Sequence, residues 1–259
     1  MTPSWDEKIR DRLSRIKHGL LYQVSPLGRV SRKHLTEMKN SRCKERCFII
    51  GNGPSLQRTD LSKLRDEYTF GLNRIYLLFP EMGFSTTSLV TVNWLVLEQC
   101  ADEILSTSST KFIPWTFRKH LNPDHLGNTI FVQCNRVDQS FTPDVTRPIW
   151  TGATVTYVAM QLAFHMGFQK VILVGVDHSF ATQGKPHAEI VSQGDDPNHF
   201  SPAYFGKGFK WQLPDLETSE IAYRLARQAF EADGREIVDA TIGGKLTVFP
   251  KVNYRELFE

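Results

Sequence analysis

The sequence lacks the short motifs that mark several large enzyme classes. It contains no Gly-x-x-x-x-Gly-Lys-Ser/Thr loop, which argues against a P-loop NTPase, and no complete Gly-x-Gly-x-x-Gly fingerprint for NAD. A Gly-x-Ser-x-Gly elbow is also missing, which argues against an α/β-hydrolase. Any nucleotide site in this chain must therefore be built from other residues.

Cysteine is scarce and follows no metal-binding pattern. The four cysteines are Cys43, Cys47, Cys100 and Cys134. The first two stand close together, but no second pair and no nearby histidine completes a site. The spacing predicts free thiols in a reducing compartment and no bound metal.

Long apolar runs are missing as well. The N-terminus is polar and charged, with spaced apolar positions, so it does not have the form of a secretory signal. No run reaches the roughly 18 apolar residues of a membrane-spanning helix. We therefore expect a cytoplasmic protein.

Charge is nearly balanced overall but uneven along the chain. A formal net charge of +3 is too small to indicate a nucleic-acid partner. Basic residues gather in residues 1–46, where apolar side chains at helical spacing predict an amphipathic helix: Trp5, Ile9, Leu13, Ile16 and Leu20. This segment is either a solvated basic face or a contact for an anionic surface, so a peripheral contact with the inner membrane stays open.

Short apolar runs alternate with helix-compatible stretches after residue 46. The runs that predict buried strands are Cys47–Ile50, Tyr68–Leu72, Ser88–Val92, Lys111–Ile113, Thr129–Gln133 and Val171–Val174. This alternation predicts an α/β fold, Rossmann-like, with a mostly parallel sheet and helices on both faces. We expect a basic helix and lead-in over residues 1–46 and a nucleotide-binding domain over residues 47–259.

Residues 176–214 form an insert with little periodicity, rich in Gly, Pro, His, Asp and Phe. An insert of this length in a compact domain is typically a lid or a binding loop. His187 and His199 are candidate general bases, because histidine exchanges protons near neutral pH. Asp195 and Asp196 could bind a divalent ion, although no spacing specifies one. The alternative is a lid that packs its own aromatic residues and leaves the histidines at the surface.

Asp177 follows the buried run that ends at Val174. A carboxylate at the end of a parallel strand is well placed for contacts with a metal, a ribose or an acceptor. His178 beside it is either a partner of this carboxylate or a polar loop residue.

The run Cys47–Ile50 breaks into Gly51-Asn52-Gly53-Pro54-Ser55. The two glycines would let a ligand approach the main chain, and Pro54 suits the first position of a helix. Ser55 adds a hydroxyl beside amides that attract anions. The turn is either a nucleotide-binding turn or a purely structural link between strand and helix.

Polar residues also follow other predicted strands. Asn73 could bond a ribose or base and Arg74 could neutralise a phosphate. Asn93 follows the next strand, and Thr151 with Gly152 opens an apolar helix where a phosphate could bind. In each case the alternative is an ordinary helix cap.

Four segments in this order carry a family resemblance: Gly51-Asn52-Gly53-Pro54-Ser55-Leu56, Asn73, Trp150-Thr151-Gly152 and Gly175-Val176-Asp177. Together they resemble two related groups over roughly residues 47–240. One group is the bacterial sialyltransferases of glycosyltransferase family 42, which use CMP-sialic acid. The other is the domain of unknown function 115, which includes 6-hydroxymethylpterin diphosphokinase-like enzymes and flagellin-glycosylation accessory factors.

The resemblance implies roles for particular residues. Asn52, Asn73, Thr151 and Gly152 would hold the nucleotide, by likeness to the sialyltransferases. A lid histidine near a tyrosine would act as the general base, and His199 with Tyr204 stands in the comparable place. The family's His-Tyr-x-Gly-His cluster is replaced here by Asn-His-Phe-Ser-Pro-Ala-Tyr. The choice between His199 and His187 therefore stays open.

These observations give three functional hypotheses. The first is an inverting, metal-independent glycosyltransferase that moves a sialic-acid-like sugar from a CMP donor to a glycan, with His199 or His187, Asp177 and Tyr204 as catalytic candidates. The second is diphosphate transfer from ATP to a small alcohol such as a hydroxymethylpterin, with Mg²⁺ on Asp177, Asp195 or Asp196 and the phosphates on Arg74. The third is a non-catalytic, nucleotide-binding accessory protein of glycosylation.

Overall fold

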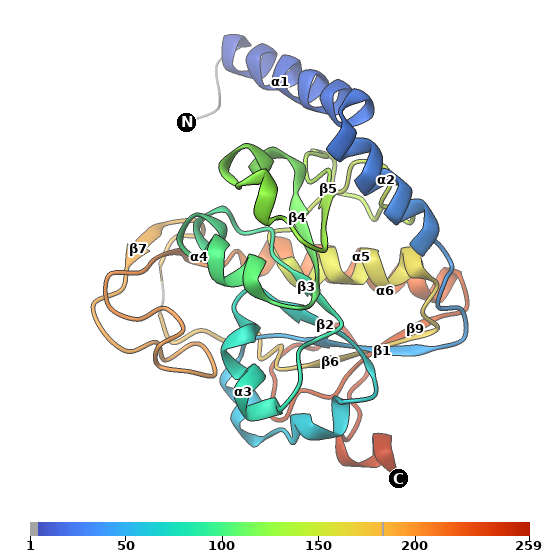
Figure 1. Ribbon diagram of the computed structural model, residues 1–259. Coiled ribbons are helices and arrows are strands. Elements are labelled where there is room, and N and C mark those ends of the chain that lie inside the picture. Colours follow the sequence, from blue (N-terminus) through green and yellow to red (C-terminus); the bar gives the residue numbers. More distant parts are fainter. Residues whose placement is uncertain (1–4, 183) are drawn as a thin grey trace.

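A parallel sheet forms the centre of the computed structural model, which describes residues 5–182 and 184–259 (Figure 1). Its seven strands lie in the order β5-β4-β3-β2-β1-β6-β9, and every neighbouring pair runs parallel. The strands are β1 (Arg46–Ile50), β2 (Tyr68–Leu72), β3 (Ser88–Val90), β4 (Thr110–Pro114), β5 (Thr129–Val132), β6 (Lys170–Val174) and β9 (Glu236–Asp239). The α/β, Rossmann-like fold predicted from the sequence is confirmed.

Helices cover both faces of this sheet, and side chains alternate between two apolar layers. Cys47 and Ile49 of β1 join the layer under α5 (Val155–Met166) and α6 (Leu216–Ala232). Phe48 and Ile50 join the opposite layer, under α3 (Phe79–Met82) and α4 (Trp94–Ser106). In Figure 1, α5 and α6 lie on one side of the strands and α3 on the other. This alternation is the period of two expected of a strand that is buried on both faces.

Two further helices precede the sheet, and the second of them is part of the core. α1 (Trp5–Val24) was expected, whereas α2 (Pro26–Met38) lies in the segment that the sequence pattern describes only as a lead-in. Ser25 caps α2 by accepting from the amide of Gly28 at 3.1 Å. The helix packs on β5, where the hydroxyl of Ser31 accepts from the amide of Phe131 at 3.0 Å. Two of its three buried residues, Gly28 and Ser31, are not apolar, so the buried face does not stand out as an apolar stripe in the sequence.

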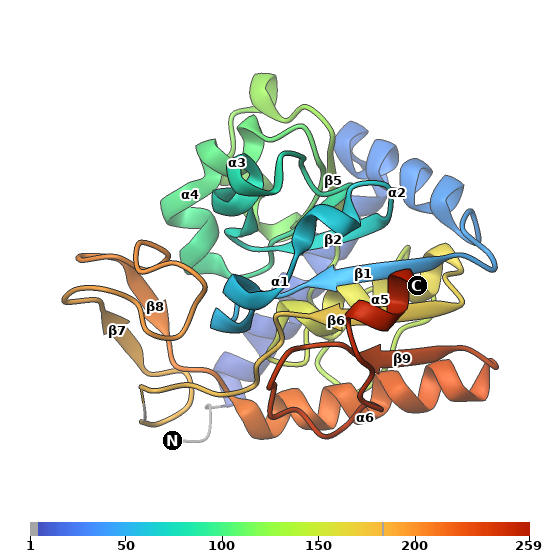
Figure 2. The same cartoon turned by 90° about the horizontal axis from the view of Figure 1, so that it is seen from below.

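Residues 176–214, called the lid below, are less irregular than the sequence suggests. They contain an antiparallel hairpin of β7 (Glu189–Val191) and β8 (Lys210–Gln212), which stands out to one side of the sheet in Figure 2. Aromatic side chains of the lid pack on one another, as the alternative interpretation proposes: Phe200, Tyr204, Phe205, Phe209 and Trp211. The lid therefore has an apolar centre of its own.

We predict that leucines on the two N-terminal helices differ sharply in their contribution to stability. Leu35 of α2 is fully buried and Leu20 of α1 is 61% exposed. Leu35→Ala is expected to lower the free energy of unfolding by about 2–5 kcal/mol. Leu20→Ala is expected to change it by about 0.5 kcal/mol or less. Urea unfolding followed by circular dichroism measures both, and equal losses would contradict the placement of α2 in the core.

Candidate functional site

A cavity of about 400 Å³ opens at the carboxyl ends of four neighbouring strands. Residues that follow these strands line it: 51–53 after β1, 73 after β2, 92–94 after β3 and 175–180 after β6. The segment 151–156 and parts of the lid close it from the other sides. In the sheet, β2 lies on one side of β1 and β6 lies on the other, so the strand order reverses at β1. The cavity therefore lies at the switch point where open α/β sheets bind ligands.

The turn after β1 is fastened to the end of β6 by Asp177. One carboxylate oxygen of Asp177 accepts from the amide of Ser55 at 3.1 Å, and the other accepts from its hydroxyl at 2.6 Å. A Cβ built on Gly53 would lie 1.8 Å from Asp177 Oδ2, and one on Gly51 would lie 2.3 Å from the carbonyl oxygen of Gly175. A side chain at either glycine would clash with the residues that follow β6, and this is why glycine is required at both positions. The sequence had suggested instead that the glycines make room for a ligand.

This fastening changes what the turn can bind. Pro54 and Ser55 open a short 3-10 helix, and Ser55 is buried outside the cavity lining. The two donors that were expected to face a phosphate are already bonded to the carboxylate of Asp177. The cavity side of the turn therefore consists of Gly51, Asn52 and Gly53.

Asn52 and Asn73 line the cavity, and each carries a buried side-chain oxygen without a protein partner. Both residues line the cavity, and Oδ1 of each has no hydrogen-bond partner in residues 5–182 and 184–259. Their backbones are fixed: the carbonyl of Asn52 accepts from Phe200 N at 2.9 Å, and Asn73 N donates to the carbonyl of Val90 at 2.9 Å. Buried polar atoms are nearly always bonded, so two such acceptors in one cavity point to a ligand that donates to them.

The helix-cap alternative holds for part of the remaining predicted set. Asn93 lines the cavity and also caps α4, since its Oδ1 accepts from the amide of Val96 at 3.2 Å. α5 is capped by Thr154, which leaves Thr151 to line the cavity. Gly152 has a φ of +59° and lies outside the lining; a Cβ there would be 2.4 Å from Cβ of Ala222. It is a close-packing residue between the turn and α6.

His199 and Asp196 form a hydrogen-bonded pair at the cavity. Nδ1 of His199 lies 2.7 Å from Oδ2 of Asp196. The same carboxylate accepts from the amides of Asn198 at 2.8 Å and Phe205 at 3.2 Å, so it is held in place. When Nδ1 carries the proton towards Asp196, Nε2 has a free lone pair and can act as a base. Sequence reasoning considered Asp196 only as a metal ligand, although its spacing of three residues from His199 could have suggested the pair.

The ring of Tyr204 packs against the imidazole of His199. The two rings are stacked, with 4.0 Å between their centroids and 10° between their planes. The hydroxyl of Tyr204 accepts from the amide of Arg74 at 3.4 Å, and burial raises the pKa of this hydroxyl well above its usual range. Tyr204 therefore stays protonated and orients the imidazole instead of exchanging a proton.

Arg74 ties the lid to the end of β2. Its guanidinium donates to the carbonyl of Tyr204 and, through Nε, to the hydroxyl of Tyr76 at 3.2 Å. It also lies over the ring of Phe209, 4.7 Å from the centroid. Arg74 is outside the cavity lining. The phosphate contact predicted for it is therefore unsupported, and its charge serves to hold the lid.

Two other lid-side histidines pair with carboxylates, but through the opposite ring nitrogen. Nε2 of His187 lies 3.2 Å from Oδ2 of Asp215, and Nε2 of His178 lies 3.1 Å from Oε1 of Glu220. The side chain of His187 is 61% exposed, compared with 13% for His199. Of the two predicted bases, His199 is the one held rigidly beside the cavity.

The cavity wall is poor in positive charge. Among the described residues that line it there is no lysine or arginine, and its carboxylates are Asp177 and Asp215. The amide of Thr218 lowers the pKa of Asp215, which caps α6. Amides, hydroxyls and imidazoles are thus the groups available to an anionic ligand.

The three acids considered for Mg²⁺ are not assembled into one site. Asp177 is bonded to Ser55 and Asp196 to His199, while Asp195 and Asp196 line a different hollow of about 240 Å³. In residues 5–182 and 184–259 no group of three or more His, Cys, Asp or Glu side chains is gathered for a metal. The four cysteines are free, as their spacing predicted.

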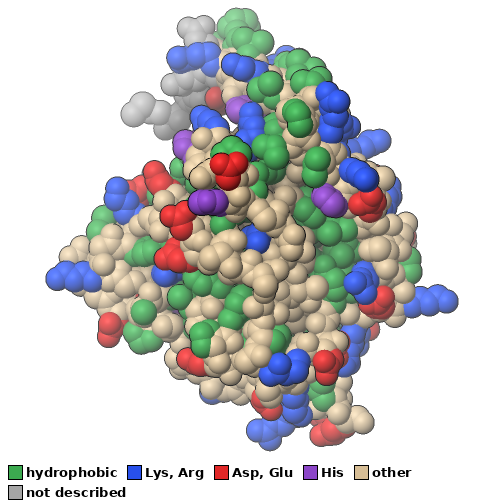
Figure 3. Space-filling view, viewed as in Figure 1, with side chains coloured by type: hydrophobic (Ala, Val, Ile, Leu, Met, Phe, Trp, Pro, Cys, Tyr) green, Lys and Arg blue, Asp and Glu red, His purple; other side chains and the backbone are tan. Residues whose placement is uncertain are grey.

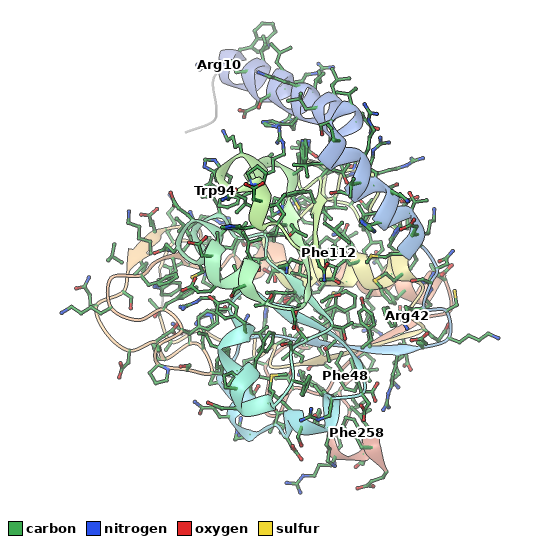
Figure 4. All side chains as sticks on the ribbon, viewed as in Figure 1. Arg10, Arg42, Phe48, Trp94, Phe112 and Phe258 are labelled. Atoms are coloured by element: carbon green, nitrogen blue, oxygen red, sulfur yellow. The ribbon has the colours of Figure 1, made fainter. Side chains whose placement is uncertain are left out.

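Trp94 at the cavity rim was missed by the sequence reasoning. It follows Asn93, is 43% exposed and lines the cavity. Its indole packs edge-on against Phe117 at 4.7 Å and His120 at 5.1 Å. Figure 4 labels Trp94 in the upper left of the view, below α1. An exposed tryptophan held this way provides an apolar platform.

Comparisons with known proteins agree with this architecture. A family model described as 6-hydroxymethylpterin diphosphokinase MptE-like matches residues 24–183, which is more than half of the chain. The matched segment contains the asparagines and Asp177 but ends before His199. No curated protein matches the chain.

A solved structure has a similar fold. It is a MAf glycosyltransferase from Magnetospirillum magneticum AMB-1, with a TM-score of 0.54 and 14% sequence identity. The similarity covers 87% of this chain but only 38% of the glycosyltransferase. At this identity the likeness shows a shared fold, and this chain corresponds to well under half of the larger protein.

We predict that Arg74→Met loosens the lid. Loss of the guanidinium bonds should raise the open population of the lid, and hence trypsin cleavage at Lys207 and Lys210, about tenfold. The rate of these cleavages is measured by mass spectrometry. Arg118→Met is the matched control, because Arg118 similarly covers Trp115 at 3.7 Å and donates to its carbonyl, away from the lid. Equal cleavage rates in the two variants would contradict the role of Arg74.

Proposed function

From the premise that this chain belongs to the 6-hydroxymethylpterin diphosphokinase MptE-like family, we propose that it is a glycosyltransferase that takes a sialic-acid-like sugar from a CMP donor. The acceptor is the hydroxyl of a glycan. One observation carries the proposal: two unpartnered asparagine oxygens and the His199–Asp196 pair meet at one cavity. The fold shared with a MAf glycosyltransferase supports it.

Asn52 and Asn73 are suited to hold the nucleoside. Their free oxygens accept hydrogen bonds, which the amino group of cytosine and the hydroxyls of ribose donate. Each of these amides also carries an NH₂ group that donates, so the pair can bind a ligand edge that presents both donors and acceptors. Thr151 adds a hydroxyl to the same wall.

The scarcity of positive charge favours a donor with one phosphate. A CMP-activated sialic-acid-like sugar carries one negative charge on its phosphodiester and one on the carboxylate of the sugar, and amides and hydroxyls can solvate the single phosphate. The triphosphate of ATP carries several, and the described lining offers no lysine or arginine to meet them. The charge of the cavity therefore favours the CMP donor among the nucleotides considered.

His199 is proposed to take the proton of the acceptor hydroxyl on Nε2. The acceptor oxygen forms a bond to the anomeric carbon while the bond from that carbon to the phosphate oxygen breaks, so CMP leaves with the electron pair. Asp196 accepts from Nδ1 and stabilises the imidazolium that forms. A single displacement of this kind inverts the anomeric centre. Trp94 would stack on the apolar face of the acceptor sugar at the rim.

Diphosphate transfer from ATP to a hydroxymethylpterin is the second candidate, because the description of the matching family favours it. It requires groups for several phosphates and for Mg²⁺. Arg74, Asp177 and Asp196 are bonded to other groups, and Asp195 lines a different hollow, so these residues do not fit it. Incubation with ATP, Mg²⁺ and 6-hydroxymethylpterin, followed by detection of AMP, tests this candidate directly.

We predict that the chain prefers cytidine nucleotides. In a calorimetric screen of CMP, UDP, GDP and ATP, CMP is expected to bind most tightly. Asn52→Ala and Asn73→Ala should each weaken CMP binding about tenfold, since each removes one hydrogen bond to the ligand. Asn135→Ala is the control, because Asn135 Oδ1 is also buried without a partner but lies outside the cavity lining. Absence of a preference for CMP would sink the proposed donor.

We predict that His199 carries the catalytic step. His199→Gln should lower the rate of CMP release from CMP-N-acetylneuraminic acid, with a panel of mono- and disaccharide acceptors, by about 10²–10⁴-fold. Asp196→Asn should lower kcat with little change in KM. His187→Gln should leave both close to the wild-type values. A larger effect of His187→Gln would move the base to His187, and CMP binding without turnover would favour an accessory protein.

A further inference from the structure

α1 turns its apolar side away from the domain. Six apolar residues spaced three or four positions apart share one exposed stripe on this helix: Trp5 (78% exposed), Ile9 (38%), Leu13 (60%), Ile16 (51%), Leu20 (61%) and Val24 (58%). An amphipathic helix on a globular protein ordinarily turns this stripe towards the core. Here the arrangement is reversed.

The opposite side of α1 holds the helix to the domain through its last turns. Tyr22 is fully buried and its hydroxyl donates to the carbonyl of Phe131 at 2.8 Å. The indole of Trp115 donates to the carbonyl of His18 at 3.0 Å and packs edge-on against Tyr22. Because this anchoring fixes the rotation of the helix, the outward direction of the apolar stripe follows from the fold. Figure 1 shows α1 projecting beyond the sheet.

The stripe continues onto α2 and is flanked by cations. Leu27 is 38% exposed and Val30 is 52% exposed, so they extend the apolar surface past Ser25. Exposed basic side chains lie along the same two helices: Arg10, Arg12, Lys17, Arg29 and Lys33. Figure 3 shows apolar and basic side chains side by side on the projecting helix. Contiguous exposed apolar surface bordered by charge marks an interaction site.

We propose that α1 and the start of α2 form a docking surface for an anionic lipid bilayer. The helix would lie in the plane of the interface, with the apolar stripe inserted between the lipids and the cations against the headgroups. None of the helices formed by residues 5–182 and 184–259 is long and apolar enough to cross a membrane. A second copy of this helix would bring its cations against one another, whereas anionic headgroups neutralise them. The charge therefore selects the lipid surface as the occupant.

This docking is independent of the proposed transferase activity and is tested without nucleotide. The full chain is mixed with vesicles of phosphatidylcholine alone or of phosphatidylcholine with phosphatidylglycerol, and binding is measured by flotation. We expect binding to the anionic vesicles that falls as salt is added, because each cation near such a surface raises partition about fivefold.

Two sets of substitutions separate the apolar and charged contributions. The variant with Leu13→Ser, Ile16→Ser and Leu20→Ser should lose at least tenfold in partition, and these exposed positions leave the fold intact by circular dichroism. Arg10→Glu with Lys17→Glu should lose binding to anionic vesicles to a similar extent. Val137→Ser is the control, because Val137 is 64% exposed and belongs to neither helix. Its partition should equal that of the wild type.

Two outcomes overturn the proposal. The first is equal partition of the wild type and the triple serine variant. The second is absence of vesicle binding together with self-association that the serine substitutions abolish, which would make this face an interface between copies of the chain.

Discussion

The contact between Asp177 and the turn after β1 is the constraint on which the candidate site depends. Both oxygens of this carboxylate bind Ser55, and the absence of a side chain at Gly53 lets the two strand ends meet. The geometry of the turn then directs the side chain of Asn52 to the cavity and its carbonyl to Phe200 of the lid. The contact between Asp177 and Ser55 thus places both a cavity-lining amide, that of Asn52, and the attachment point of the lid.

The lid holds His199, the proposed general base, beside the turn after β1. Arg74 at the end of β2 donates to the carbonyl of Tyr204, and Gln57 donates to the carbonyl of Phe200 at 2.7 Å. Between these attachments the ring of Tyr204 lies under His199, and Asp196 fixes its Nδ1. Residues buried among aromatic rings therefore orient an imidazole beside a polar cavity. In the proposed mechanism, the sheet supplies the binding groups and the lid supplies the base.

Much of the fold could be predicted from the sequence, because local patterns determine it. Apolar runs placed β1 to β6, and polar residues after them placed Asn52 and Asn73 at one edge of the sheet. The contacts that assign roles are not local: Ser55 and Asp177 are 122 positions apart, and Arg74 and Tyr204 are 130 apart. No periodicity in the sequence encodes such pairs. This is why Ser55 and Arg74 were expected to bind phosphate, and why α2, with glycine and serine on its buried face, was not expected as a helix.

The unpartnered oxygens of Asn52 and Asn73 have a consequence for the protein without ligand. Each buried acceptor that lacks a donor destabilises the fold by about 1–3 kcal/mol, and Asn73 also has a left-handed backbone, with φ of +48°. The chain therefore gives up stability to keep two acceptors ready and rigid. A sequence selected only for folding would replace these asparagines. The unpartnered oxygens thus lower the free energy of unfolding of the ligand-free protein. A ligand that donates to both oxygens would raise it again.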